Sequence, residues 1–263
     1  MLQTILTQMK TDGWCVLRDV IPPEQVAAVR DSVAATVAQH RNPHAPQHIG
    51  HLSGLINQDQ SFAPYLAQPD LLDLLQGLLG PAVRISFTTA TINEPGNERG
   101  EWHADWPFNQ RNAGHIPAPY PDALMHLTTI WMLSAFSMAS GGTLLVPGSH
   151  RLPDNPTGDN GVDPYQSLPD EIYATGGAGS VLVMDSRLWH ATAPNTSPEP
   201  RVAIVIRYAP WWLDLSVLRP GSPARAQLQA LTGKPDNQVP PLPVAVFGRL
   251  PEAVKPLYAH WVE

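Results

Sequence analysis

A histidine and an aspartate two positions apart, His103 and Asp105, are the first candidates for chemistry in this sequence. Residues i and i+2 of an extended chain point to the same side, so the imidazole and the carboxylate can hold one metal ion together. An H-x-D triplet also arises by chance. Its setting favours a metal site, because Trp102 precedes it and Trp106 follows it where an expected strand gives way to a loop.

His190 can complete this site. It follows an expected strand at residues 180–185, and a turn with three prolines then leads to another expected strand that begins at Arg201. If the two strands pair as a hairpin, Arg201 lies near His190. Two histidines and one carboxylate on one face of a metal leave three coordination positions open, which is the arrangement of non-haem Fe(II) oxygenases.

The open coordination positions give Arg201 a function. A 2-oxo acid chelates iron through its keto oxygen and the adjacent carboxylate, which leaves the third position for O2. The distant carboxylate of the acid then needs a fixed cation, and a planar guanidinium binds it through two parallel hydrogen bonds. Two other interpretations remain open: a jelly-roll protein that binds a metal or a sugar without turnover, and a zinc hydrolase. Neither assigns a role to Arg201.

The composition limits the classes of partner. The chain of 263 residues has 16 Lys and Arg against 23 Asp and Glu, a formal charge of −7, which disfavours nucleic acid and anionic membrane surfaces. No apolar run reaches the ~18 residues of a membrane helix, and the first residues lack the apolar core of a signal peptide. We therefore expect a cytoplasmic protein that acts on a small molecule. The single cysteine, Cys15, excludes an internal disulfide and is expected to be a buried apolar residue.

The elements that must position these residues form a helical part and a β-rich part. Proline suits the first turn of a helix, and it opens two expected helices, one from residue 22 to about His40 and one over residues 69–79. A polar, histidine-rich loop separates them, and a short strand at residues 13–20 precedes them. After residue 82 we expect strands at residues 83–92, 124–133, 143–146, 180–184 and 201–208.

Short strands separated by glycine and proline clusters are typical of an antiparallel barrel or sandwich. The sequence therefore predicts one domain over residues 1–263. Its helical part reaches to about residue 80 and its β core covers about residues 82–210. A proline-rich tail at residues 211–263 is expected to wrap the surface and to carry a short helix near residues 224–231.

From Asp12 to Tyr208 the sequence resembles the phytanoyl-CoA dioxygenase family of Fe(II)- and 2-oxoglutarate-dependent oxygenases. The resemblance is carried by several motifs in order. They are GWCVL at residues 13–17 with the helix after it, the pair His103-x-Asp105, GGTLLVPGSH at residues 141–150, and His190-Ala191-Thr192 with an arginine eleven residues after that histidine.

The resemblance implies a mainly β fold with flanking α-helices and a double-stranded β-helix core, the jelly-roll or cupin-like architecture. It implies that His103, Asp105 and His190 are the catalytic iron ligands and that Arg201 binds the far carboxylate of 2-oxoglutarate. Two further co-substrate contacts are expected at the hydroxyl of Thr192 and at the ring of Trp131.

The same resemblance implies Fe(II), 2-oxoglutarate and O2 as cofactor and co-substrates. Because Asp105 is intact, whereas halogenating relatives replace this carboxylate, the expected reaction is hydroxylation of an unactivated C–H bond of a small metabolite, with release of succinate and CO2. Desaturation, cyclisation and epimerisation use the same cofactors and remain alternatives.

Substrate contacts are expected on loops around the metal. Trp106 and Asn109 follow the metal pair directly and could close over it, as could the histidine-rich loop at residues 44–57. Arg207 shares strand parity with Arg201, so it is a candidate for contact with an anionic substrate.

Overall fold

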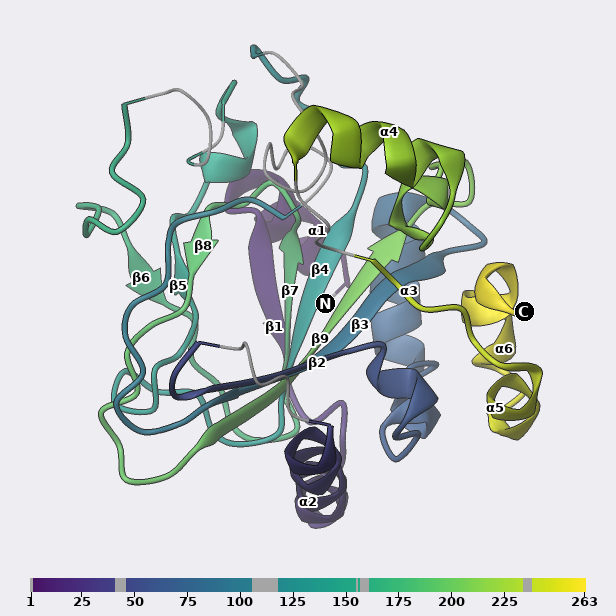
Figure 1. Cartoon of the computed structure of the whole chain (residues 1–263). Coiled ribbons are helices and arrows are strands. Elements are labelled where there is room, and N and C mark those ends of the chain that lie inside the picture. The colour runs from purple at the N-terminus through teal and green to yellow at the C-terminus, as the bar shows by residue number, and fades with distance from the viewer. Residues whose placement is uncertain (1, 41–45, 106–117, 155, 157–160, 234–237) are drawn as a thin grey trace.

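The computed structural model describes residues 2–40, 46–105, 118–154, 156, 161–233 and 238–263. Two antiparallel sheets organise these residues (Figure 1). The main sheet has the strand order β1 (Trp14–Leu17), β7 (Val181–Asp185), β4 (Leu127–Met132), β9 (Arg201–Ala209), β3 (Arg84–Asn93) and β2 (Ile49–Ser53). The small sheet has the order β6 (Ile172–Tyr173), β5 (Leu144–Leu145) and β8 (His190–Ala191).

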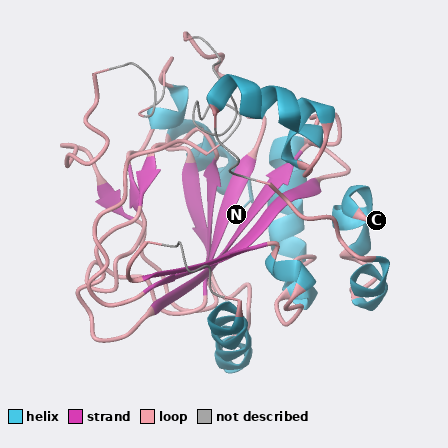
Figure 2. Cartoon of the chain, viewed as in Figure 1, coloured by secondary structure: helices cyan, strands magenta, loops and turns pink. Residues whose placement is uncertain are grey.

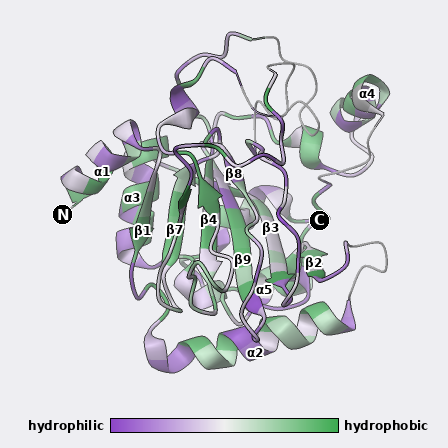
Figure 3. Cartoon of the chain, turned by 90° about the vertical axis from the view of Figure 1, so that its left-hand side faces the viewer, coloured by the Kyte–Doolittle hydropathy of each residue, from purple (hydrophilic) through white to green (hydrophobic). Residues whose placement is uncertain are grey.

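Helices flank the main sheet, while the small sheet lies on its left in Figure 2. The helices are α1 (Leu2–Thr11), α2 (Pro23–Gln39), α3 (Pro69–Leu79), α4 (Pro223–Thr232), α5 (Val244–Arg249) and α6 (Lys255–Tyr258). Proline occupies the first turn of α2, α3 and α4, where its missing N–H costs nothing. Figure 3 shows α2 crossing below the sheet, where it buries a stripe of four valines, Val26, Val29, Val33 and Val37.

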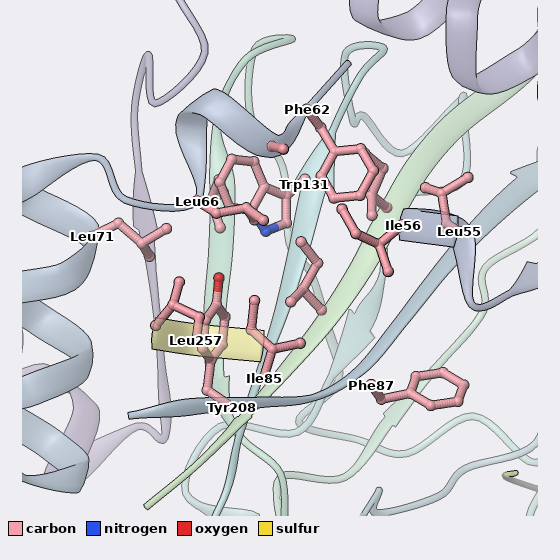
Figure 4. Close-up of a cluster of buried hydrophobic side chains, with 14 of the residues drawn as sticks. Leu55, Ile56, Phe62, Leu66, Leu71, Ile85, Phe87, Trp131, Tyr208 and Leu257 are labelled. Atoms are coloured by element: carbon pink, nitrogen blue, oxygen red, sulfur yellow. The ribbon is translucent and has the colours of Figure 1, made fainter. Parts of the chain in front are cut away.

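The largest hydrophobic core lies between the helices and the main sheet. Leu71 of α3 and Trp131 of β4 are fully buried in it (Figure 4). Two short 3-10 helices, Leu55–Asn57 and Ala63–Tyr65, lie between α2 and α3 in the sequence and contribute buried residues to this core. Alternate residues of β9 point to opposite faces of the main sheet. Val202, Ile204 and Ile206 pack in this core, while the residues between them face the small sheet.

Most of the elements that the sequence predicted lie within one or two residues of their expected bounds, whereas α1, β2, β6, β8, α5 and α6 were not predicted. The helix expected over residues 69–79 has those bounds, and the strand expected at 201–208 is β9 at 201–209. The mainly β, jelly-roll fold class is confirmed. In the part of the chain that the structure describes, no helix combines the length and the apolar character needed to cross a bilayer.

The expected hairpin between residues 180–185 and the strand at Arg201 is wrong. β7 pairs with β1 and β4, and β9 pairs with β3 and β4, so β4 lies between them. The connection of 15 residues between β7 and β9 is too long for a tight turn, and it contributes β8 to the small sheet before the chain returns.

The C-terminal segment is part of the main core, although the sequence predicted a tail that only wraps the surface. The expected helix near residues 224–231 is α4, but the segment after it buries Leu242, Val246 and Leu257 in the core. Trp261 also donates a hydrogen bond from Nε1 to the carbonyl of Ile85 at 2.7 Å. Proline spacing hid this packing, because it broke the apolar positions into runs too short to show a period.

Replacing Leu257 by alanine tests this packing. The side chain is 5% exposed and contacts the core shown in Figure 4, so Leu257→Ala should lower the free energy of unfolding by about 2–5 kcal/mol. Leu231→Ala is the matched control, because Leu231 is 63% exposed and should change stability by no more than about 0.5 kcal/mol. Urea unfolding followed by circular dichroism measures both, and equal stabilities would contradict a C-terminal segment in the core.

Candidate metal centre

The backbone brings the two candidate histidine ligands side by side. The amide of His103 donates to the carbonyl of His190, and the amide of His190 donates to the carbonyl of His103, both at 3.0 Å. Residues that exchange both hydrogen bonds lie directly opposite each other and present their side chains on one face. The two imidazole rings are accordingly 4.2 Å apart between centroids.

Asp105 joins these histidines because it lies two residues after His103. Its amide donates to the carbonyl of Ser186 at 2.7 Å, which fixes the end of the H-x-D segment. The carboxylate oxygens lie 3.8 Å from Nε2 of His103 and 3.6 Å from Nε2 of His190. One candidate ligand atom from each of the three residues therefore faces the others, and these atoms lie within 4.8 Å of one another.

Both histidines are oriented for ligation through Nε2. Nδ1 of His103 donates to the carbonyl of Glu101 at 3.0 Å, and Nδ1 of His190 donates to the carbonyl of Leu188 at 2.8 Å. A carbonyl only accepts, so Nδ1 carries the proton and Nε2 presents its lone pair. Burial lowers the pKa of His190 to about 4, which keeps this ring neutral. Two imidazoles and one carboxylate form the donor set that suits Fe(II).

The Asp105 carboxylate is 4% exposed and accepts two short hydrogen bonds. Nη2 of Arg207 donates to Oδ1 and the hydroxyl of Thr128 donates to Oδ2, both at 2.6 Å. Burial alone would raise the pKa of this carboxyl, but the Arg207 guanidinium and the Thr128 hydroxyl hold it far below its usual value. These contacts keep Asp105 an anion in the metal-free protein.

Arg201 is a buried cation in the same cavity. Nη1 donates to the carbonyl of Gly141 at 2.7 Å, and the guanidinium lies over the ring of Phe136 at 4.5 Å from its centroid. Burial lowers its pKa to about 10, so it stays charged at neutral pH. Within the described residues no ion pair is formed by Arg201, so an anionic ligand would compensate its charge.

The double glycine before β5 allows the carbonyl of Gly141 to reach Arg201. Gly141 has φ +73°, and a Cβ there would lie 2.8 Å from the carbonyl oxygen of Ala193. A Cβ on Gly142 would lie 2.6 Å from the carbonyl oxygen of Ala174. Both positions exclude a side chain, which explains the two glycines at the start of the motif at residues 141–150.

A cavity of about 180 Å³ between the two sheets connects these residues. The three candidate ligands line it together with Thr192, Arg201 and Arg207. Arg201 and Arg207 lie on the same face of β9, as their parity predicted. Arg207 contacts Asp105, a contact that the sequence did not predict.

Trp131 does not contact this cavity, so the expectation that it lines the co-substrate pocket is wrong. Its neighbours Thr128 and Ile130 face the cavity, and strand alternation turns Trp131 to the opposite side of β4. There Nε1 donates to the hydroxyl of Thr129 at 2.9 Å, and the ring packs near Phe62 (Figure 4). The tryptophan is a core residue.

Trp106 and Asn109, the two loop residues expected to contact substrate, lie outside the described residues. The sequence analysis did not name the threonines that line the cavity, which are Thr89, Thr91, Thr128 and Thr143. His51 also lines it, from β2, within the segment expected to be a loop near the metal, and its Nε2 is 3.1 Å from the hydroxyl of Thr89. On β3 the alternation of polar Thr89 and Thr91 with apolar Ala90 and Ile92 is the signal that could have indicated this face.

Asn93 is a neighbour of Arg201 that does not itself line the cavity. The two residues are directly opposite each other in the pairing of β3 with β9, so their side chains lie on the same face. Asn93 is fully buried, yet neither amide atom has a hydrogen-bond partner within the described residues. An unpartnered buried amide beside a buried cation fits a polar ligand between the sheets.

Comparison with known proteins agrees with this geometry. Residues 9–203 match the family model described as phytanoyl-CoA dioxygenase (PhyH). A "Dioxygenase af480" from Aspergillus fumigatus is 31% identical over 156 residues, which cover 57% of this chain and 45% of that protein. The match thus spans less than half the length of this relative.

Two solved structures share the fold. The epimerase SnoN, in complex with Fe3+, alpha ketoglutarate and nogalamycin RO, superposes with a TM-score of 0.64 at 19% identity, covering 80% of this chain and 83% of SnoN. HygX from Streptomyces hygroscopicus, with nickel, 2-oxoglutarate and hygromycin B bound, gives a TM-score of 0.61 at 16% identity, covering 80% of this chain and 88% of HygX. The family match covers most of the chain, and the His103, Asp105 and His190 triad is in place. The chain therefore belongs to the phytanoyl-CoA dioxygenase family of non-haem iron, 2-oxoglutarate-dependent enzymes.

Proposed function

We propose that this protein hydroxylates an unactivated C–H bond of a small-molecule metabolite in the cytoplasm. The reaction converts substrate R–H, 2-oxoglutarate and O2 into R–OH, succinate and CO2, which balances all atoms. The observation that carries the proposal is the buried, charged guanidinium of Arg201 in the cavity of the metal triad. Neither a zinc hydrolase nor a binding protein without turnover would need this cation.

Each residue of the cavity has a role in this proposal. His103, Asp105 and His190 bind Fe(II), and Arg201 binds the far carboxylate of 2-oxoglutarate. The hydroxyl of Thr192 and, from beside the cavity, the side-chain amide of Asn93 supply further hydrogen bonds to the co-substrate. When bound, Fe(II) and 2-oxoglutarate supply the oxidising power, while the chain supplies ligation, orientation and a site shielded from water.

The size of the cavity indicates where the substrate binds. Its 180 Å³ is below the range of about 300–1,000 Å³ that is typical of pockets for drug-sized ligands. We therefore assign the cavity to the co-substrate and place the metabolite at its mouth, near Arg207. Trp106 and Asn109 stay predicted substrate contacts. The guanidinium of Arg207, already paired with Asp105, would then contribute a second hydrogen bond to an anionic or carbonyl group of the substrate.

Binding of the cofactors can be tested without a known substrate. Anaerobic addition of Fe(II) and then 2-oxoglutarate to the metal-free protein should produce the weak visible charge-transfer band of the iron chelate. The band should require both additions and be lost in His103→Ala, since this variant lacks one of three ligands. His150→Gln is the control, because His150 lies outside the cavity, with Nε2 near the carbonyl of Lys10 at 3.3 Å. A folded protein that binds iron and shows no band would contradict the co-substrate assignment.

Arg201 should determine affinity for 2-oxoglutarate but not for the metal. Removing one partner of a buried charge pair costs about 2–5 kcal/mol, so Arg201→Leu should weaken 2-oxoglutarate binding by about 30-fold or more. Arg201→Lys keeps the charge without the planar fork and should lose less. Titration of the visible band with 2-oxoglutarate gives the 2-oxoglutarate affinity of each variant. The proposal fails if Arg201→Leu binds 2-oxoglutarate as tightly as the exposed control Arg30→Leu.

The type of oxidation can be read from product mass once a substrate is found by succinate release. Hydroxylation adds one oxygen atom, desaturation or cyclisation removes two hydrogen atoms, and epimerisation leaves the mass unchanged. We expect the added oxygen atom, and any other mass change would replace hydroxylation by the matching alternative.

A further inference from the structure

A chain of buried polar side chains runs from the Asp105 carboxylate into the protein. The hydroxyl of Thr128 donates to Oδ2 of Asp105 at 2.6 Å and lies 2.8 Å from the hydroxyl of Ser186. Ser186 lies 2.8 Å from Nδ1 of His126, and Nε2 of His126 lies 2.7 Å from the hydroxyl of Ser86. His126 is 2% exposed, and the three hydroxyl residues are fully buried.

The direction of every hydrogen bond in this chain follows from its first member. The hydroxyl of Thr128 donates its single proton to the carboxylate of Asp105. It must therefore accept a hydrogen bond from the hydroxyl of Ser186. Ser186 has then used its own proton, so it must accept from Nδ1 of His126. His126 therefore carries a proton on Nδ1. On a neutral ring the bare Nε2 accepts the single proton of Ser86 at 2.7 Å, in preference to the carbonyl of Arg207, which lies 3.2 Å from the same hydroxyl. Burial, and to a smaller extent the Arg207 charge, lowers the pKa of His126 to about 3, consistent with a neutral ring.

A β-bulge places Ser86 at the end of this chain. In the pairing of β3 with β9, Ile85 lies opposite Tyr208 and Phe87 lies opposite Arg207, so Ser86 has no partner residue. An extra residue of this kind bends the strand and redirects a side chain, and bulges are common beside active sites. The fold therefore interrupts its longest strand at the residue that donates to His126.

We propose that His126 is a positioning residue for the iron ligand Asp105, and that it acts through Ser186 and Thr128. The chain of donors holds Oδ2 while Arg207 holds Oδ1, so the plane of the carboxylate is set before the metal binds. This inference rests on the iron site. The inference adds three residues to that site, His126, Ser186 and Ser86, whose side chains do not line the cavity. Loss of an outer partner of this kind typically reduces metal affinity about 10–100-fold.

Co(II) binding tests the chain without catalysis. In the metal-free protein, Thr128→Val and Ser186→Ala should each weaken Co(II) binding by about tenfold or more and shift the visible bands of the bound ion. Thr128→Ser restores the hydroxyl and should stay within about threefold of the original protein. Thr129→Val is the matched control. Thr129 follows Thr128 but points to the opposite, core-facing side of β4, where its hydroxyl donates to the carbonyl of Ile206. Its replacement should leave the Co(II) affinity and spectrum unchanged.

Nuclear magnetic resonance tests His126 directly. Its 15N chemical shifts, assigned by the signals lost in His126→Gln, should show the Nδ1–H tautomer, which is the reverse of the preference of free histidine. An Nε2–H tautomer, or a Ser186→Ala variant with unchanged Co(II) affinity and spectrum, would overturn the inference and leave the proposed function intact. An original protein that binds no Co(II) would overturn the metal centre and this inference together.

Discussion

Asp105 must remain an anion in a place where water hardly reaches it, and much of the structure follows from this requirement. Removing a carboxylate from water costs several kcal/mol unless other groups replace the solvent. Here the replacements come from two directions: a guanidinium from β9 and a hydroxyl from β4. The same negative charge is what attracts a divalent cation to the centre.

In the jelly-roll, alternate residues of one strand serve different purposes: one set packs in the core and the other set lines the cavity. On β9, Val202, Ile204 and Ile206 pack under the helices, while Arg201 and Arg207 face the small sheet. A single strand thus supplies the core and both cations of the cavity. The small sheet is only two residues long in each strand, and it can stay short because the main sheet and its helices already bury the large core.

The sequence was sufficient for the metal ligands because their spacing is local or belongs to a motif. His103 and Asp105 are two residues apart on one short segment, and His190 and Arg201 lie eleven residues apart within motifs that carry the resemblance to the family. Trp131 was misplaced because alternation shows which residues share a face but not which face is the core. Polarity does not settle the face on β4 either, because Thr128 and Thr129 are adjacent and point to opposite sides.

Other parts of the site could not be read from sequence for physical reasons. The contact of Arg207 with Asp105 joins residues 102 positions apart, and the chain from Thr128 to Ser86 joins three segments that only the sheet brings together. The bulge at Ser86 has no glycine or proline to mark it. Tertiary geometry, and not local propensity, fixes these contacts.

The strand order has a consequence for folding during synthesis on the ribosome. Among neighbours in the main sheet, only β2 and β3 are consecutive in the chain, whereas Trp14 of β1 pairs with Met184 of β7. At ribosomal rates of roughly 5–20 residues per second, β1 emerges on the order of ten seconds before its partner. β3 waits a shorter time for β9, but longer for Trp261, which closes its bulged end. The nascent chain therefore exposes unpaired strand edges during its synthesis, and the metal centre cannot form before His190 has been made.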